Sequence, residues 1–229
     1  MELSSTSNNH LLNKNTYINL RWIGIIGQFI TINTVNFILK FEFNYILSNT
    51  VIFFGAISNL ALIYFYKENQ LSERTSFYFL VLDIIQLSFL LFLTGGIVNP
   101  FSIFLLIPSI FASTSLNLKI NILLIFLTII SIIFITFFHE KLPSPLNNYI
   151  INKYYYYSIP IALIMALIFL NYFAITFGKE SRIRKDALDK IQEVISKEHE
   201  LVSLGTQAAA AAHSLGTPLS TIKIISHEL

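Results

Sequence analysis

The residue with the clearest capacity for chemistry is His213, in the segment LGTQAAAAAHSLGTPLSTI. An imidazole can serve as a general base or a nucleophile. The five alanines before it form helix well and carry minimal side chains. His213 is therefore expected to project from a smooth helix surface that a partner domain can approach closely. By composition alone, a packed or solvent-facing histidine is favoured by about two to one.

A second group of residues forms a short loop, GGIVNPF, between two apolar segments. Gly95 and Gly96 allow backbone conformations that other residues avoid, and they permit a flat ring to approach closely. Asn99 offers amide donors to a carbonyl group, Pro100 stiffens the turn, and Phe101 can stack. The alternative is a tight helix-to-helix turn, because Gly-Gly and Asn-Pro are ordinary turn formers.

Asp83 lies inside the apolar stretch FYFLVLDIIQLSFLLFL. An ionised carboxylate costs about 2.5–3.5 kcal/mol within a membrane on insertion scales. We therefore expect Asp83 to face other helices, protonated or hydrogen-bonded to Gln86, Asn33 or Asn36. A proton relay and structural polar contacts between helices both remain open.

The composition places these residues in a membrane protein. Hydrophobic residues make up 54% of the chain, charged residues only 12%, and the mean hydropathy is +0.65, far from a soluble domain. With no cysteine, disulfides, thiolate metal sites and thiol redox switches are excluded within these residues. The net charge of +2 is not gathered in a basic patch, so nucleic acid is not an expected partner and no metal site is predicted.

The hydropathy pattern predicts an all-α fold with six transmembrane helices, since about 20 apolar residues cross a bilayer core. The six segments run approximately over 20–40, 45–66, 77–94, 101–117, 120–138 and 155–177.

Flanking positive charges predict that both termini are cytoplasmic. The side expected to be cytoplasmic carries nine basic residues: Lys14, Arg21, Lys67, Arg74, Lys119, Lys179, Arg182, Arg184 and Lys185. The opposite side carries Lys40, Lys141 and Lys153.

After the last apolar segment the chain becomes charged and free of proline. Leu188, Ile191, Ile195 and Val202 follow at spacings of three and four, which is typical of an amphipathic helix with a seam narrow enough for a parallel coiled coil. Glu198 interrupts this seam. We divide the chain into an N-terminal segment (1–19), a membrane sensor domain (20–177), a linker helix (178–203) and the helix that carries His213 (204–229).

The segment LVSLGTQAAAAAHSLGTPLSTI resembles the phosphoacceptor helix of the RegB/PrrB/ActS family of redox-responsive sensor histidine kinases, and GGIVNPF resembles the loop through which that family is thought to sense ubiquinone. The resemblance implies that His213 accepts a phosphoryl group from ATP and passes it to a response regulator. It implies that Thr217 assists dephosphorylation. It further implies a homodimer, and a ubiquinone contact at Gly95, Gly96, Asn99, Pro100 and Phe101.

Two departures from the family pattern limit this expectation. Ser214 stands where the family has an acidic residue thought to act as general base for the imidazole, and serine replaces it poorly at neutral pH. Only 16 residues follow His213, so we expect the second hairpin helix and the ATP-binding domain to be missing. The chain would then not phosphorylate itself, and ATP would act only through a separate kinase half.

The interpretation that follows is the sensor part of a truncated or split RegB-like kinase in the bacterial inner membrane. Its expected partners are membrane lipid, a second copy of the chain, a kinase half and a response regulator. The alternatives are a six-helix transporter or scaffold without a signalling role, which the lack of paired membrane charges disfavours, and a gene remnant.

Overall fold

A computed structural model describes residues 12–143, 146 and 152–227, with side chains to residue 214. The described chain is all-α apart from two two-residue strands, β1 (Leu12–Asn13) and β2 (Gln70–Leu71), which pair antiparallel. The main α-helices are α1 (Lys14–Asn33), α2 (Tyr45–Phe65), α3 (Glu73–Leu93), α4 (Ile107–Ser115), α5 (Leu118–Phe137) and α6 (Lys153–His227). The π-helix η1 (Thr34–Ile38) extends α1, and the 3-10 helices η2 (Gly96–Val98) and η3 (Pro100–Leu106) lead into α4.

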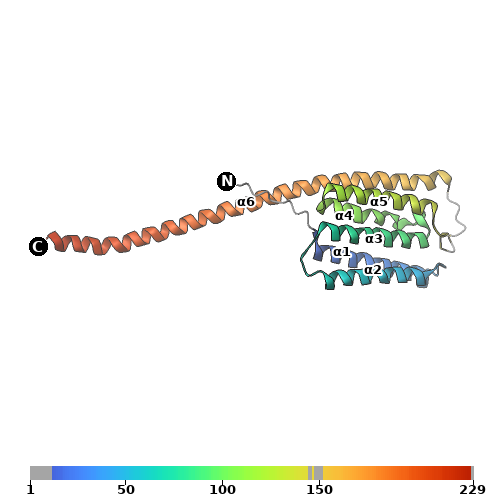
Figure 1. The fold of residues 1–229 in the computed structure, drawn as a ribbon, viewed down its shortest axis with the longest axis horizontal. Helices are drawn as coiled ribbons and strands as arrows, with labels where there is room; N and C mark the ends of the chain where they lie inside the picture. Colours follow the sequence, from blue (N-terminus) through green and yellow to red (C-terminus); the bar gives the residue numbers. More distant parts are fainter. Residues whose placement is uncertain (1–11, 144–145, 147–151, 228–229) are drawn as a thin grey trace. The chain divides into compact units, whose positions relative to one another are not determined.

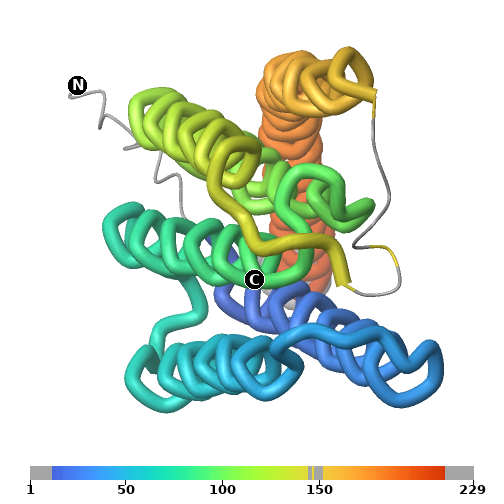
Figure 2. The backbone as a smooth tube through the Cα atoms, turned by 90° about the vertical axis from the view of Figure 1, so that its right-hand side faces the viewer, coloured from blue at the N-terminus to red at the C-terminus, as the bar shows by residue number. Residues whose placement is uncertain are grey.

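Contacts divide the chain at residue 178 into two units, and the first contains the helical bundle. In this bundle α1 and α2 lie on one side, α5 and the beginning of α6 on the other, and α3 and α4 between them (Figures 1 and 2). Fully buried leucines and isoleucines from several helices, such as Leu80, Ile84, Leu124 and Leu167, form the core. The outward faces are rich in exposed Ile, Leu and Phe, as expected where lipid replaces water around the bundle.

Four helices in the described residues are long and apolar enough to cross a membrane: α2, α3, α5 and the Lys153–Ser214 part of α6. The apolar helix Pro100–Ser115 is shorter. α1 is not among the four, although it lies in the bundle. The membrane character is therefore clear, whereas the count of six crossings remains a prediction.

α1 begins earlier than the hydropathy pattern suggests. The side chain of Asn13 accepts a hydrogen bond from the Thr16 backbone N–H at 3.1 Å, which caps the helix and satisfies one of its unpaired donors. The helix therefore starts at Lys14 rather than near residue 20, and Arg21 lies two turns inside it. This places a charged side chain within the bundle.

The second unit is the continuation of α6 from Lys179. The seam residues Leu188, Ile191, Ile195 and Val202 are all exposed on this single chain. Glu193 accepts a hydrogen bond from Lys197 at 2.7 Å, and this contact lowers the pKa of the Glu193 carboxyl. Exposed i,i+4 pairs of this kind support a solvated helix only weakly.

Candidate functional site in the membrane bundle

The polar centre of the bundle is an ion pair between α1 and α3. Arg21 Nη2 lies 2.8 Å from Asp83 Oδ1, and Arg21 Nε donates to the same oxygen at 2.9 Å. The Arg21 side chain is 4% exposed and that of Asp83 is 18% exposed. The hydroxyl of Tyr17 donates to Asp83 Oδ2 at 2.6 Å. Each carboxylate oxygen of Asp83 therefore has a partner.

The rest of the guanidinium is held by α2 and by aromatic rings. Arg21 Nη2 donates to Ser58 Oγ at 2.6 Å, and Nη1 donates to Asn59 Oδ1 at 3.3 Å. The guanidinium carbon lies 5.4 Å from the ring centre of Phe79, within the range of a cation–π contact. This network joins three helices, α1, α2 and α3, and satisfies the buried charges as an apolar interior requires.

These contacts correct three expectations. Asp83 bonds to Arg21 and Tyr17, and not to Gln86, Asn33 or Asn36. Arg21 is an interior partner and not a flanking charge, because α1 begins at Lys14. Paired membrane charges are present after all, so their supposed absence no longer counts against a transporter. The pair had a signal in the sequence. Asp83 lies within an apolar segment, and Arg21 lies seven residues after the first residue of α1.

A second polar contact lies along the same two helices. Gln86 Nε2 donates to Gln28 Oε1 at 3.2 Å. The amide of Gln86 also packs on Gly55 of α2, where an added Cβ would lie 2.5 Å from it. Glycine at this position therefore lets α2 approach the glutamine closely.

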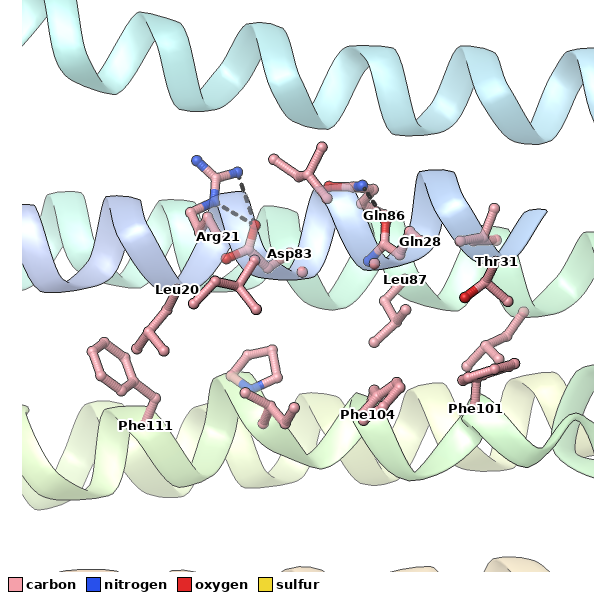
Figure 3. A pocket seen from close by; sticks show the side chains of 18 of the residues that line it. Leu20, Arg21, Gln28, Thr31, Asp83, Gln86, Leu87, Phe101, Phe104 and Phe111 are labelled. Carbon is pink, nitrogen blue, oxygen red and sulfur yellow. Dashed lines mark hydrogen bonds and ion pairs between the residues drawn. The ribbon is translucent and has the colours of Figure 1, made fainter. Parts of the chain in front are cut away.

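A cavity of about 520 Å³ opens between α1 and α3 on one side and η3 and α4 on the other. Figure 3 shows the rings of Phe101, Phe104 and Phe111 on the η3–α4 side and Leu20, Leu87 and Thr31 facing them. Its walls are mostly apolar, with the ion pair and the two glutamines on the α1–α3 side. The volume lies within the usual range for small-molecule sites. We call this space the interhelical cavity.

The GGIVNPF loop lies at one end of this cavity, but only two of its predicted site residues line it, Asn99 and Phe101. Gly95 and Gly96 have φ values of +106° and +63°, in the region that favours glycine. An added Cβ on Gly95 would lie 2.6 Å from Leu142, and one on Gly96 2.5 Å from His139. The close approach at the two glycines is thus made by the protein's own loop after α5.

Asn99 has a structural task in this loop. Its side-chain amide donates to Thr94 Oγ1 at 2.7 Å and to the Thr94 carbonyl oxygen at 3.1 Å. Its Oδ1 accepts from the Phe101 backbone N–H at 2.9 Å, which caps η3. Pro100 occupies the first turn of that helix. Asn99 therefore holds the ring of Phe101, 42% exposed, at the end of the cavity.

The opposite face of α4 contacts α6. Asn171 Oδ1 accepts a hydrogen bond from Ser109 Oγ at 3.2 Å and another from Ser113 Oγ. All three residues are buried. Since Ile107, Pro108 and Phe111 of the same short helix line the cavity, α4 connects the cavity wall with the helix that continues toward His213. This role of Asn171 could not be predicted from sequence, because one Asn in an Asn-rich chain carries little signal.

Replacing Asn171 by leucine should destabilise the bundle by about 1–3 kcal/mol, the usual cost of a buried hydroxyl without its partner. Ser109 would lose its acceptor, whereas Ser113 retains Asn121 Oδ1 at 3.1 Å. The free energy of unfolding in detergent micelles measures the effect. Thr176→Val on the exposed face of α6 is the control, because Thr176 bonds only within its own helix. Equal stability of Asn171→Leu and Thr176→Val would contradict this role.

His213 lies on the exposed surface of α6, in the second unit. The neighbouring Ser214 Oγ donates to the Ala211 carbonyl oxygen at 2.9 Å, so this hydroxyl bonds to its own helix. The backbone remains helical through residue 227. Thr217 lies outside the residues whose side chains the structure describes. Most of the predicted N-terminal segment 1–19 also lies outside the described residues.

Comparisons with known proteins identify two similar curated sequences. The chain is 33% identical over 218 residues to the sensor histidine kinase RegB of Cereibacter sphaeroides, covering 93% of this chain and 47% of that protein. It is 42% identical over 69 residues to RegB of Cereibacter sphaeroides strain ATCC 17023, covering 30% of this chain and 15% of that protein. The chain therefore spans at most about half the length of the curated relatives it matches. No family model matches the chain. No solved structure matches it either.

Proposed function

Because this chain is a RegB-type sensor histidine kinase homologue over nearly its whole length, we propose that it is the membrane sensor and phosphoacceptor part of a two-component system. The observation that supports this most strongly is the 93% coverage of the chain, which includes both the bundle and the helix that carries His213. In this proposal His213 receives a phosphoryl group from an ATP-binding kinase domain and passes it to a response regulator. Thr217 would assist dephosphorylation.

The sensed ligand in this proposal is ubiquinone. The interhelical cavity supports it, because the cavity is mostly apolar, has the volume of a small-molecule site and lies inside a membrane bundle. The aromatic rings of Phe101 and Phe104 are stacked at 5.8 Å between centres beside the GGIVNPF loop. A quinone ring from the lipid phase can pack on such aromatic surface.

Transmission to His213 would run through α4 and α6. A ligand in the interhelical cavity contacts one face of α4, and Ser109 and Ser113 on the other face bind Asn171 of α6. A shift of α4 would change this contact and so bias the helix that continues to His213. The exposed seam at Leu188, Ile191, Ile195 and Val202 would pack against a second copy of the chain as a coiled coil.

The proposed setting is the bacterial inner membrane, with both termini cytoplasmic. With Arg21 buried in the bundle, eight of the nine basic residues assigned to the cytoplasmic side remain, against three on the other side. The charge bias therefore still favours the same orientation.

Photo-labelling tests the quinone proposal. An azido-quinone added to membranes that contain the chain should label the segment from Thr94 to Phe104. Asn99→Ala should reduce this labelling severalfold, because Phe101 would lose the backbone cap that positions its ring. Peptide mapping by mass spectrometry provides the measurement.

The matched control is Asn44→Ala, which removes a helix-capping asparagine at the start of α2 instead. Labelling that is confined to segments that do not line the interhelical cavity would reject the quinone site. Equal labelling of Asn99→Ala and wild type would reject only the role of Asn99.

A further inference from the structure

The two polar groups on the α1–α3 wall of the interhelical cavity differ in how many of their hydrogen-bonding atoms have partners. The ion pair is satisfied, since both oxygens of Asp83 and three nitrogens of Arg21 have partners. The glutamine pair is only half satisfied. Gln28 accepts from Gln86, but within the described part of the chain its own Nε2 group donates to nothing. Gln28 is half-buried and lines the cavity, so its Nε2 group can donate a hydrogen bond to a ligand there.

The α1 wall beside Gln28 is bare backbone. Gly24 and Gly27 both line the cavity, and a Cβ added to either would meet no atom within 4 Å. Phe104, Ile107 and Pro108 form the facing wall. A space bounded by glycine backbone on one side and by ring and aliphatic side chains on the other suits a flat ring.

We propose that the quinone head group binds inside this cavity, against Gly24 and Gly27, with a carbonyl oxygen accepting a hydrogen bond from Gln28 Nε2. The inference rests on the proposed function and moves the ring-binding contact from the loop to the α1 wall of the cavity, where both glycines are exposed. A quinone carbonyl is an acceptor, which matches the spare donor. The hydrocarbon part of a lipid acyl chain has no acceptor and would leave that donor unpaired.

The location also explains why the loop residues have internal partners. Asn99 uses its amide on Thr94 and caps η3, and the glycines pack against Leu142 and His139. The loop then shapes the end of the cavity, and the hydrogen bond to the ligand comes from α1. Ligand contact at Ile107 and Pro108 would act directly on α4.

Binding of ubiquinone-1 to the whole chain in lipid nanodiscs tests the inference. The chain has one tryptophan, Trp22 on α1, so quenching of its fluorescence reports the dissociation constant. Gly24→Leu and Gly27→Leu place a side chain in the cavity and should weaken binding at least about tenfold, because the occupied volume excludes the ring. Gln28→Met removes the donor at similar size and should weaken binding roughly three- to tenfold.

Each substitution has a matched control on α6. Gly205→Leu introduces the same side chain where a Cβ likewise meets no atom within 4 Å, and Gln207→Met removes an exposed amide. Both controls should bind like wild type. Because leucine also raises helix propensity relative to glycine, thermal unfolding should show that the cavity variants remain folded.

Wild-type affinity in Gly24→Leu and Gly27→Leu would overturn the cavity site while leaving quinone binding at the loop intact. That outcome is also the one expected if lipid or a second copy of the chain fills the cavity. Loss of binding in the glycine variants with unchanged affinity in Gln28→Met would overturn the assigned donor. If the wild-type chain itself does not bind ubiquinone-1, the quinone-sensing part of the proposed function fails, and this inference fails with it.

Discussion

His213→Gln is expected to abolish phosphoryl transfer to this chain. The chain would be reconstituted in membranes with the second hairpin helix and the ATP-binding domain of a RegB-type kinase and supplied with labelled ATP. Glutamine keeps a polar side chain but has no nucleophilic ring nitrogen, so the acceptor is lost rather than weakened. Acid-labile, base-stable phosphate on the chain provides the measurement.

His199→Gln is the control for this loss, because His199 is exposed on the same helix. It should be labelled at the wild-type rate. Acid-labile phosphate that persists in His213→Gln would show that the acceptor is assigned wrongly.

Ser214→Glu should raise the rate of labelling at least about tenfold. General-base assistance typically contributes about 10²–10⁴-fold, and the wild-type Ser214 hydroxyl donates to its own helix at Ala211. A carboxylate beside the imidazole can accept the ring proton as the phosphorus–nitrogen bond forms. If Ser214→Glu changes nothing while His213 is still labelled, the acceptor stands and the explanation of its weak activation fails.

Breaking the buried ion pair should have the largest effect on stability. Arg21→Met should destabilise the bundle by about 3–5 kcal/mol, because removing one partner leaves an uncompensated buried charge on Asp83. The free energy of unfolding in detergent micelles measures the loss. Arg184→Met, which removes an exposed pair with Glu180, should change it little.

The double variant Arg21→Met/Asp83→Leu distinguishes charge burial from lost packing. Replacing both charges by apolar side chains removes the desolvation cost together with the attraction, so most of the lost stability should return. The hydroxyl of Tyr17 would still lack its acceptor, and recovery should therefore be incomplete. If the double variant is no more stable than Arg21→Met alone, the ion pair does not explain the effect.

The apolar composition and the long hydrophobic segments were sufficient to predict an all-α membrane fold. The segments predicted at 45–66, 77–94 and 120–138 agree with α2, α3 and α5 to within four residues. The segment 101–117 is divided between η3 and α4, the last segment belongs to a helix that continues to His227, and α1 begins six residues before its predicted start. There the Asn13 cap extends the helix back to Lys14, and capping depends on backbone geometry that hydropathy does not measure. That displacement of the start changed Arg21 from a predicted flanking charge into an interior residue.

The likeness to RegB was also predictable from sequence, because two motifs in order, around Gly95–Phe101 and His213, are specific even without coordinates. The geometry of these two motifs was not predictable from sequence. The amide of Asn99 was predicted to face a ligand, whereas it bonds to Thr94 and caps η3. A side chain's partners depend on which neighbours the turn brings within hydrogen-bond range.

Burial of apolar surface in lipid and helix periodicity are local properties of the chain, so the order of amino acids is enough to indicate a helical membrane protein with a histidine on a polar helix. Which distant polar residues meet depends instead on how the helices pack. Arg21 and Asp83 are 62 residues apart, Gln28 and Gln86 are 58 apart, and Ser109 and Asn171 are 62 apart. Such pairs form because an apolar interior leaves buried polar groups no partner but one another, and the packing of the helices selects which groups are within reach.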